Sequence, residues 1–199
     1  MSPLRVVLAS RSAARRALLQ GAGVAFEAVS AALDEEAAKA GLAEQGLGPR
    51  AMAEALAAAK AVETSRTVDG LVIGADQTLE LDGELVSKAA SIAEARTRLM
   101  QMRGRRHHLH SAVAAAEGGA LVWAEVETAT LTVRAFSQAF LDRYLARNAD
   151  AALASVGGYQ LEGEGVQLFE RIDGDYFTIL GLPLPPLLKF LRERGVLVE

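Results

Sequence analysis

Apolar runs and alanine-rich segments alternate along the first third of the chain. Short buried strands are predicted at residues 4–9, 26–29 and 71–73. Helices are predicted at residues 12–23 and 48–65. Ser10 or Ser12 can cap the first of these helices, and Pro49 falls in the first turn of the second.

The stretch "GLVIGADQTLELDG" carries an acid where a buried strand is predicted to end. The apolar run that begins at Gly70 reaches Asp76, and a second strand is predicted from Thr78 to Leu81 before a turn at Asp82–Gly83. A buried carboxylate is costly unless a partner compensates its charge. Asp76 therefore needs either a partner or a function.

Hairpin patterns dominate the later part of the chain. Residues 108–133 predict two or three strands around Gly118–Gly119, and residues 166–183 predict a hairpin that turns at Asp173–Gly174. Further helices are predicted at residues 91–104, 137–148 and 184–195. Early alternation followed by hairpins predicts a mixed sheet in one α/β or α+β domain over residues 1–199.

Composition narrows the function classes. The chain has 199 residues, 51% of them hydrophobic, which suits one domain with a sizeable core. A net charge of −4 gives no support to binding of a nucleic-acid polymer, and the lack of cysteine excludes thiol chemistry. No run approaches the roughly 20 apolar residues of a membrane span, and the N-terminus lacks a signal-peptide pattern. We therefore expect a cytoplasmic protein that does not enter a membrane.

The first strand leads directly into a basic helix start, "SRSAARR". Free N–H groups at a helix start and the guanidinium groups of Arg11, Arg15 and Arg16 are suited to phosphate. A capped helix with a solvated basic first turn is the simpler alternative, although basic residues oppose the helix dipole there.

Other charged residues are ambiguous when each is taken alone. The acidic run 34–36 could supply part of a Mg²⁺ site, or could stabilise a helix start through the helix dipole. Lys60 on a small apolar face and Lys88 in a loop both suit ordinary solvated lysines. The histidines of "RRHHLH" alternate faces on a strand, so a shared metal site is not expected.

An ordered set of motifs gives these residues a common interpretation. The set closely resembles the Maf family of nucleotide pyrophosphatases, also called septum-formation-inhibitor-like proteins, along almost the whole chain. Its members are "LASRSAARRALL", "LDEE", "AAAKA", "VIGADQ", "DGELVSK", "RGRRHHLHSAV", "GGYQLEGEG" and "ERIDGDYFTILGLPLPPL". Each motif is weak alone, but the order is specific.

The resemblance implies both a fold and a reaction. The fold is an elongated, curved mixed sheet flanked by helices, with a deep cleft between two lobes. The reaction is hydrolysis of the α–β phosphoanhydride of a nucleoside triphosphate to the monophosphate and pyrophosphate. The enzyme would use a divalent cation, Mg²⁺ or Mn²⁺, act as a homodimer, and remove non-canonical nucleotides.

The resemblance also implies roles for single residues. Asp76 matches the catalytic acid, and together with Glu35 it would hold the metal; the alternative for Asp76 is a strand-end acid that helps the next turn. Four further residues match the substrate-binding side chains of the family: Ser10, Arg15, Lys60 and Lys88. We therefore expect the three cations among them to line one cleft with Asp76.

Ala14, Gln77 and Glu162 match the positions at which the subfamilies differ. Members that act on 7-methyl-GTP resemble Trp, Gln and Glu at these positions, and members that act on dTTP and UTP resemble Arg, Thr and Gln. Gln77 and Glu162 favour the first group, and the donors of a guanine edge suit the carboxylate of Glu162. Ala14 lacks the stacking aromatic ring. The sequence thus favours a modified purine, with dTTP or UTP as the alternative.

Two other classes of function stay open at this point. A non-catalytic nucleotide sensor could act in the control of cell division, which the family is linked to. A phosphatase would release inorganic phosphate instead of pyrophosphate. Identification of the product from a panel of triphosphates separates all three.

Overall fold

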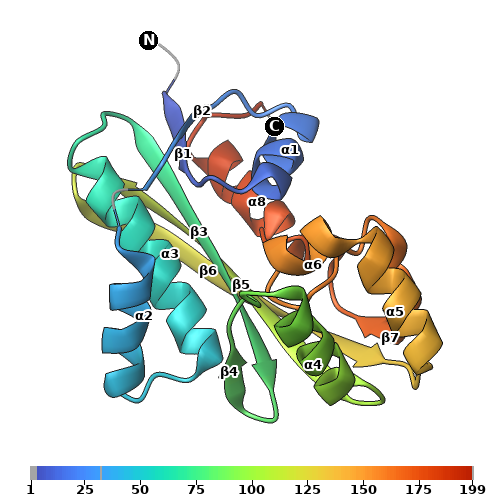
Figure 1. Ribbon diagram of the computed structural model, residues 1–199. Helices are drawn as coiled ribbons and strands as arrows, with labels where there is room; N and C mark the ends of the chain where they lie inside the picture. The colour runs from blue at the N-terminus through green and yellow to red at the C-terminus, as the bar shows by residue number, and fades with distance from the viewer. Residues whose placement is uncertain (1–3, 32, 199) are drawn as a thin grey trace.

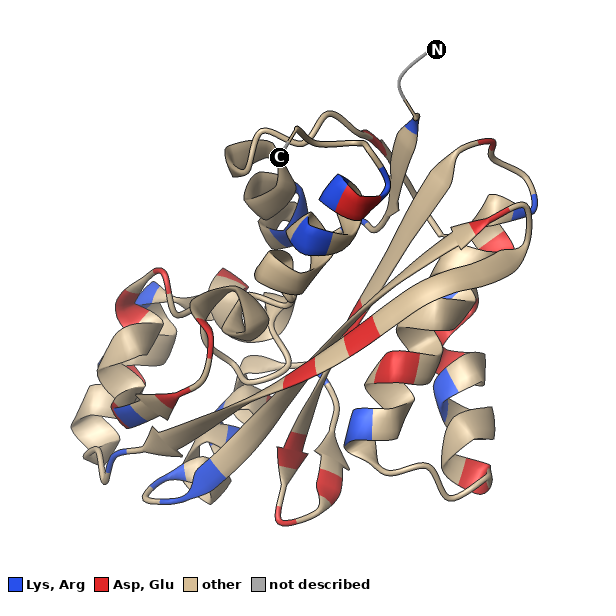
Figure 2. Ribbon diagram, turned by 180° about the vertical axis from the view of Figure 1, so that it is seen from behind, with Lys and Arg blue, Asp and Glu red and all other residues tan. Residues whose placement is uncertain are grey.

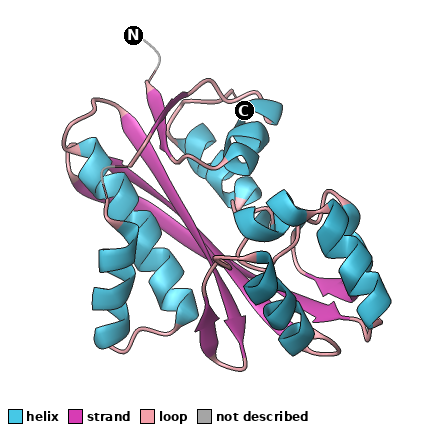
Figure 3. Cartoon of the chain, in the orientation of Figure 1, coloured by secondary structure: helices cyan, strands magenta, loops and turns pink. Residues whose placement is uncertain are grey.

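The computed structural model describes residues 4–31 and 33–198 and contains one mixed sheet flanked by helices (Figures 1 and 3). Residues 1–3, 32 and 199 of the predicted domain lie outside the described residues. The strands are β1 (Val6–Ala9), β2 (Glu27–Val29), β3 (Leu71–Leu81), β4 (Glu84–Val86), β5 (Arg106–Glu117), β6 (Ala120–Val133) and β7 (Phe169–Asp173). The sheet confirms the predicted fold class.

Helices lie between several of these strands and after the last one. They are α1 (Ala13–Gly21), α2 (Glu35–Glu44), α3 (Pro49–Ser65), α4 (Ile92–Met102), α5 (Gln138–Arg147), α6 (Ala149–Ala154), the 3-10 helix η1 (Glu164–Leu168), α7 (Tyr176–Ile179) and α8 (Leu184–Glu193). Within the described part of the chain, none of these helices has the length and apolar character needed to cross a membrane. Basic and acidic positions are interspersed along helices and strands (Figure 2).

The strand order leaves an opening in one edge of β3. The sheet runs β2-β1-β3-β5-β6-β7, and β4 pairs with the far end of β3. On this edge β1 pairs in parallel with Leu71–Gly74, and β4 pairs antiparallel with Leu79–Leu81. Among the described strands, residues 75–78 therefore have a neighbour only on the other edge, where β5 pairs with them. Asp76 lies in this opening.

The helices divide the core into separate clusters. Figure 1 shows α2 and α3 on one side of the long strands, α1 and α8 on the other side, and α4, α5 and α6 around the opposite end of the sheet. The α3 cluster is built of small residues: Ala53, Ala57, Ala61, Ala112, Ala114, Ala116 and Val126. Larger side chains fill two further clusters, one that includes Leu8, Ile73 and Leu187 and one that includes Leu99, Leu131 and Phe136. A small fourth cluster is formed by Val7, Ala9 and Val72. The apolar core is therefore distributed along the sheet and is not concentrated at one point.

Gly74 allows α3 to lie directly against β3. A Cβ atom at this position would lie 2.3 Å from Ala57 O and 2.6 Å from Ala61 N, which is closer than side-chain atoms approach backbone. The neighbouring alanines on α3 are fully buried, so the small side chains on both elements permit this contact. The close approach carries Lys60, which precedes Ala61, to the level of Asp76.

We expect Gly74→Ala to lower the free energy of unfolding by about 1–3 kcal/mol, because α3 must move away from β3 to admit the methyl group. For a domain of this size each kcal/mol lowers Tm by about 2–4 °C. Gly41→Ala in α2 is the control, since a Cβ there meets nothing within 4 Å. Equal Tm values for the two variants would contradict the packing argument.

Two predicted elements differ from the structure, and one open choice is resolved. Residues 71–81 form one continuous strand and do not break at Asp76, because β5 pairs with β3 through this point. The predicted hairpin at residues 166–183 is wrong: η1, β7 and α7 occupy this segment, β7 pairs with β6, and Asp175 caps α7. The choice of helix cap for α1 is settled in favour of Ser12, which accepts a hydrogen bond from Arg15 N.

Candidate active site

A cleft of about 870 Å³ opens at the gap in the edge of β3. Its walls come from the β1–α1 junction, the starts of α1 and α2, the buried face of α3, the loop after β4, and the segments that follow α6 and α7. All of the predicted site residues line it: Ser10, Ala14, Arg15, Glu35, Lys60, Asp76, Gln77, Lys88 and Glu162. The prediction that Arg15, Lys60 and Lys88 share a cleft with Asp76 is confirmed.

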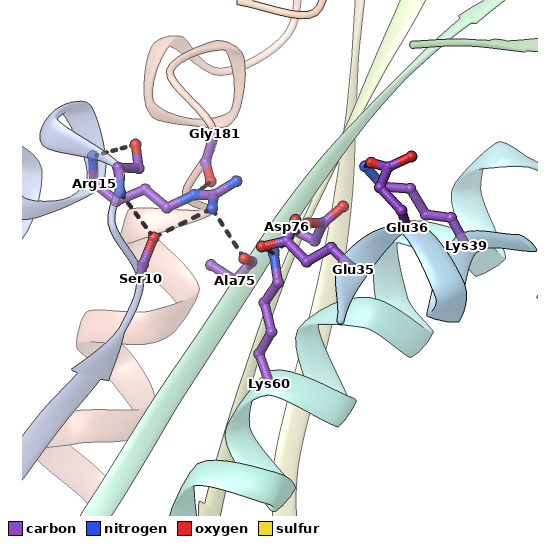
Figure 4. A network of polar contacts seen from close by, with 10 residues as sticks. Ser10, Arg15, Glu35, Glu36, Lys39, Lys60, Ala75, Asp76 and Gly181 are labelled. Atoms are coloured by element: carbon purple, nitrogen blue, oxygen red, sulfur yellow. Dashed lines mark hydrogen bonds and ion pairs between the residues drawn. The ribbon is translucent and has the colours of Figure 1, made fainter. Parts of the chain in front are cut away.

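Lys60 lies between two carboxylates on one side of β3 (Figure 4). Its Nζ is 2.7 Å from Asp76 Oδ1 and 3.1 Å from Glu35 Oε1. The side chains of Lys60 and Asp76 are only 6% and 7% exposed, so Lys60 does not extend into the solvent as a surface lysine does. Two acids against one base leave this group with a net negative charge.

The second carboxylate oxygen of Asp76 has no partner. Oδ2 is buried and makes no hydrogen bond to any of the described residues. Because an ionised carboxylate oxygen only accepts, an unpaired one is costly in a buried position and requires a donor or a cation. Asp76 thus lines the cleft with one carboxylate oxygen buried and unpaired among the described residues, which stabilising a turn at the end of a strand would not require.

Arg15 holds the opposite side of the opening (Figure 4). Its Nε donates to Gly181 O at 2.7 Å, and its Nη1 donates to Ala75 O at 2.9 Å and to Ser10 Oγ at 3.5 Å. Ser10 Oγ also accepts from Ser12 N at 3.2 Å. Nη2 of the guanidinium makes no hydrogen bond to a described residue, and both acceptor positions of the serine oxygen are occupied. The remaining hydrogens on Nη2 and on the serine hydroxyl are free to bind an anion.

The two sides of the cleft influence one another electrostatically. Burial lowers the pKa of Arg15, while the charges of Asp76 and Glu35 act in the opposite direction, and the guanidinium stays protonated. Burial also acts to raise the pKa of Glu35, but the ion pair with Lys60 and the charges of Lys39 and Arg15 together hold it below its usual value. Both groups are therefore charged at neutral pH.

Lys88 and Lys39 add positive charge to the rim. Lys88 is exposed in the loop between β4 and α4, and among the described residues no carboxylate lies within ion-pair distance of it. Lys39 lines the cleft from α2 and lies 3.7 Å from Glu36. The sequence analysis missed Lys39, although its position four residues after Glu35 on a helix places both on one face.

The segment that carries Glu162 is held by two tyrosines. The hydroxyl of Tyr159 lies 2.6 Å from His107 Nε2 on β5, and Tyr144 donates to Gly158 O at 3.1 Å. Glu162 is exposed three residues after Tyr159 and faces the cleft from this anchored turn. The base-reading role implied for Glu162 thus falls on a side chain that is free to meet a ligand.

The histidines are separated as the strand alternation predicts. His107 faces Tyr159, whereas His108 bonds to Thr130 Oγ1 and His110 bonds to Thr128 Oγ1 on the other face. Among residues 4–31 and 33–198 no group of three or more histidine and acidic side chains is arranged to hold a metal. A cation in the cleft would therefore depend on Asp76 and Glu35 together with oxygen atoms of a ligand.

Burial of His107 predicts a loss of stability in acid. Burial, with a smaller effect from His108, lowers the pKa of His107 to about 4. The unfolded chain takes up this proton near pH 6.5 and the folded chain does not, so stability falls as pH drops from 6.5 toward 4. Between pH 8 and pH 5 the loss from this residue is about 2 kcal/mol.

Urea unfolding at pH 8 and pH 5 measures this contribution. We expect His107→Gln to flatten the pH dependence by about 2 kcal/mol relative to the unmodified protein, while His108→Gln, which removes only the smaller effect on His107, changes it far less. The same pH dependence in all three proteins would contradict the assignment to His107.

Comparisons with known proteins agree with this geometry. A family model described as "Maf-like protein" matches residues 5–194. A nucleoside triphosphate pyrophosphatase of Caulobacter vibrioides is 59% identical over 197 residues, covering 99% of each chain. A 7-methyl-GTP pyrophosphatase of Rhizobium meliloti is 52% identical over 198 residues, with 99% of each chain covered. A solved nucleoside-triphosphatase / dITP/XTP pyrophosphatase from Mycobacterium abscessus has a TM-score of 0.43 at 16% identity over 96% of this chain and 94% of its own, a likeness too distant for any argument.

Proposed function

Because this chain belongs to the Maf-like protein family, we propose that it is a nucleoside triphosphate pyrophosphatase that cleaves the α–β phosphoanhydride. The observation that supports this most directly is that hydrogen-bond donors and a carboxylate lie on opposite sides of the opening in the edge of β3. Free donors of Ser10 and Arg15 lie on one side, and the unpaired oxygen of Asp76 lies on the other. The donors on the first side can bind the anionic oxygens of a polyphosphate, and the carboxylate on the second side can accept a proton from water.

The reaction adds water across one P–O–P linkage. The polyphosphate is held by Arg15, Ser10 and Lys88, whose donors face anionic oxygens. Asp76 accepts a proton from the attacking water, whose oxygen forms the new bond to phosphorus. The P–O bond to the bridging oxygen breaks, and its electron pair leaves with that oxygen on pyrophosphate. Positive charge at the rim stabilises the developing negative charge of this leaving group.

A divalent cation fits the carboxylate side of the cleft. Asp76 Oδ2 is a buried oxygen to which no described residue donates. The carboxylate of Glu35 pairs with the same Lys60 ammonium group as Asp76 does. Two carboxylates plus phosphate oxygens are the donor set that Mg²⁺ and Mn²⁺ use with nucleotides. When bound, the cation would neutralise phosphate charge and polarise a phosphoryl oxygen. Asp76 and Glu35 are the residues that would hold it.

A panel of triphosphates tests the function directly. The protein is incubated with 7-methyl-GTP, dTTP, UTP and CTP in the presence of Mg²⁺ or Mn²⁺, and the products are identified. We expect a monophosphate and pyrophosphate, with 7-methyl-GTP the preferred substrate, because the relatives include a 7-methyl-GTP pyrophosphatase and because Gln77 and Glu162 both line the cleft. Preference for dTTP or UTP would favour the pyrimidine alternative. Release of inorganic phosphate, or binding without hydrolysis, would reject the proposal.

We expect Glu162→Gln to lower kcat/KM for 7-methyl-GTP by roughly tenfold to a hundredfold. A carboxylate can accept from both N–H groups of a guanine edge, whereas uracil and thymine present carbonyl oxygens on either side of one N–H. Activity on dTTP and UTP should stay unchanged or rise slightly. Glu170→Gln on β7, which is exposed and does not line the cleft, is the control. An equal fall on all three substrates would place Glu162 in the phosphate or metal machinery.

We also propose that the enzyme acts as a homodimer in the cytoplasm, as the family resemblance implies. Sedimentation velocity over a range of protein concentrations measures the assembly state, and fractionation of cells measures the location. A monomer at concentrations where the enzyme is fully active would reject the dimer.

A further inference from the structure

The amide nitrogen of Gln77 is surrounded by three acceptors. Nε2 lies 2.9 Å from Ser111 Oγ, 3.1 Å from Thr178 O and 3.0 Å from Ile179 O. The two carbonyl oxygens, at the end of α7, can only accept. Ser111 Oγ donates its single hydrogen to Thr178 O at 2.6 Å, so toward Gln77 it can only accept as well.

These contacts permit one orientation of the amide. A turn of 180° would place Oε1 against three acceptors, none of which has a hydrogen to give. Ser111 stands directly opposite Gln77 in the register of β3 and β5, and it is 0% exposed. The Ser111 hydroxyl therefore cannot donate to water in place of Thr178 O. The side-chain nitrogen of Gln77, and not its oxygen, therefore faces β5 and α7.

The carbonyl oxygen of Gln77 is left for the cleft. No described residue donates to Oε1, and this oxygen is not among the buried atoms without a partner, so it has access to the cleft that Gln77 lines. We propose that Ser111 and the α7 carbonyl groups position Gln77 so that it offers the nucleobase an acceptor and no donor. Ser111 is thereby a positioning residue for base selection.

An acceptor without a donor selects for bases with N–H groups on the facing edge. The inference rests on the proposed function, because it takes the cleft to hold a nucleobase. Guanine presents N1–H beside its 2-amino group, and an amide oxygen pairs with either. Uracil and thymine present one N–H between two carbonyl oxygens. A freely turning amide could donate to a carbonyl oxygen through its nitrogen, whereas a fixed amide can pair only with the single N–H. Glu162 also only accepts, so both side chains favour the same edge.

Gln77→Glu tests the fixed orientation, because fixed and free amides predict opposite results. If Gln77 is fixed, the new carboxylate oxygen must face the carbonyl oxygens of Thr178 and Ile179. We then expect Tm to fall by about 5 °C or more at pH 8, and by less at pH 5 where the carboxyl group can take a proton. The ratio of kcat/KM for 7-methyl-GTP over UTP should change less than about threefold, because an acceptor oxygen still faces the base. A ratio raised by more than this, or a Tm difference that does not depend on pH, would overturn the proposal.

Two further variants separate positioning from simple packing. Ser111→Ala removes an acceptor of Gln77, whereas Thr178→Val is the matched control, because it removes the 2.6 Å bond from Thr178 Oγ1 to Glu127 Oε2 and keeps the main-chain carbonyl. We expect the first variant to lower the substrate ratio several-fold and the second to leave it unchanged. Equal ratios in both variants would overturn the role of Ser111.

The orientation also has a readout that does not require activity. In the nitrogen-15 spectrum of the full chain, the side-chain NH₂ protons of Gln77 should exchange slowly with water, and faster in Ser111→Ala than in Thr178→Val. Fast exchange in the unmodified protein would overturn the fixed orientation. Failure of the unmodified protein to release pyrophosphate would reject the proposed function, while these exchange rates and the Tm values would still decide how Gln77 is held.

Discussion

Asp76→Asn is expected to keep the fold and to lower pyrophosphatase turnover at least about a hundredfold, the scale of losing a positioned acid–base group. The amide that replaces the carboxylate can still accept from Lys60 Nζ, now 2.7 Å from Oδ1, and Glu35 continues to balance the ammonium charge. The amide cannot take a proton from water and is a poor ligand for a divalent cation. The measurement is steady-state release of pyrophosphate, with circular dichroism to check the fold.

Glu80→Gln is the matched control for this variant. Glu80 lies on the same strand and the same face, four residues further along, where it bonds to His110 Nε2 and does not line the cleft. We expect the control to retain near-normal turnover. If Asp76→Asn is folded and turns over as fast as Glu80→Gln, the carboxylate of Asp76 takes no part in the reaction.

Lys60→Met is expected to lower the free energy of unfolding by about 3–5 kcal/mol, as removal of one partner from a buried ion pair does. Methionine fills a similar volume, so packing against β3 is largely kept, but Asp76 is left as a buried charge with no counterion. The Glu35 side chain is 39% exposed, so water can stabilise its negative charge once the ammonium group is gone. The Asp76 side chain is only 7% exposed and lacks this compensation. Urea unfolding at neutral pH measures the loss.

The double variant Lys60→Met with Asp76→Asn distinguishes charge from packing. Once the carboxylate is neutral, the missing ammonium group matters little, so the second substitution should restore at least about half of the stability lost to the first. If the double variant is no more stable than Lys60→Met, the loss comes from packing of the lysine chain and the ion pair does not hold the site.

The sequence predicts the members of the site better than it predicts their contacts. Motif order was sufficient to place Asp76, Lys60 and Arg15 in one cleft, because each lies on an element whose type was predicted correctly: a strand for Asp76 and helices for the other two. The partners of Arg15 are main-chain carbonyl oxygens of Ala75 and Gly181. Every residue has such an oxygen, so no side-chain pattern can identify which one will be used.

Two errors in the predicted elements have the same physical origin. A polar residue within an apolar run looked like the end of a strand at Asp76, and an Asp-Gly pair looked like a hairpin turn at Asp173–Gly174. In the first case β5 supplies hydrogen bonds along the other edge and Lys60 compensates the charge, so the strand continues. In the second, the Asp175 side chain accepts from the N–H groups of Phe177 and Thr178 and begins a helix where a second strand was expected. Both outcomes depend on tertiary partners that local patterns do not contain.

The hydrogen bond from Arg15 to Gly181 joins residues 166 positions apart, whereas Lys60 and Asp76 are only 16 positions apart. The Lys60–Asp76 side of the cleft can therefore form early in synthesis, but the Arg15 side has to wait until Gly181 has left the ribosome. At synthesis rates of about 5–20 residues per second, the stretch from Asp76 to Gly181 takes roughly 5–20 s. During that interval the nascent chain holds a lysine–aspartate pair without the arginine geometry opposite it. The arginine side of the cleft therefore reaches its final geometry only after Gly181 has been synthesised.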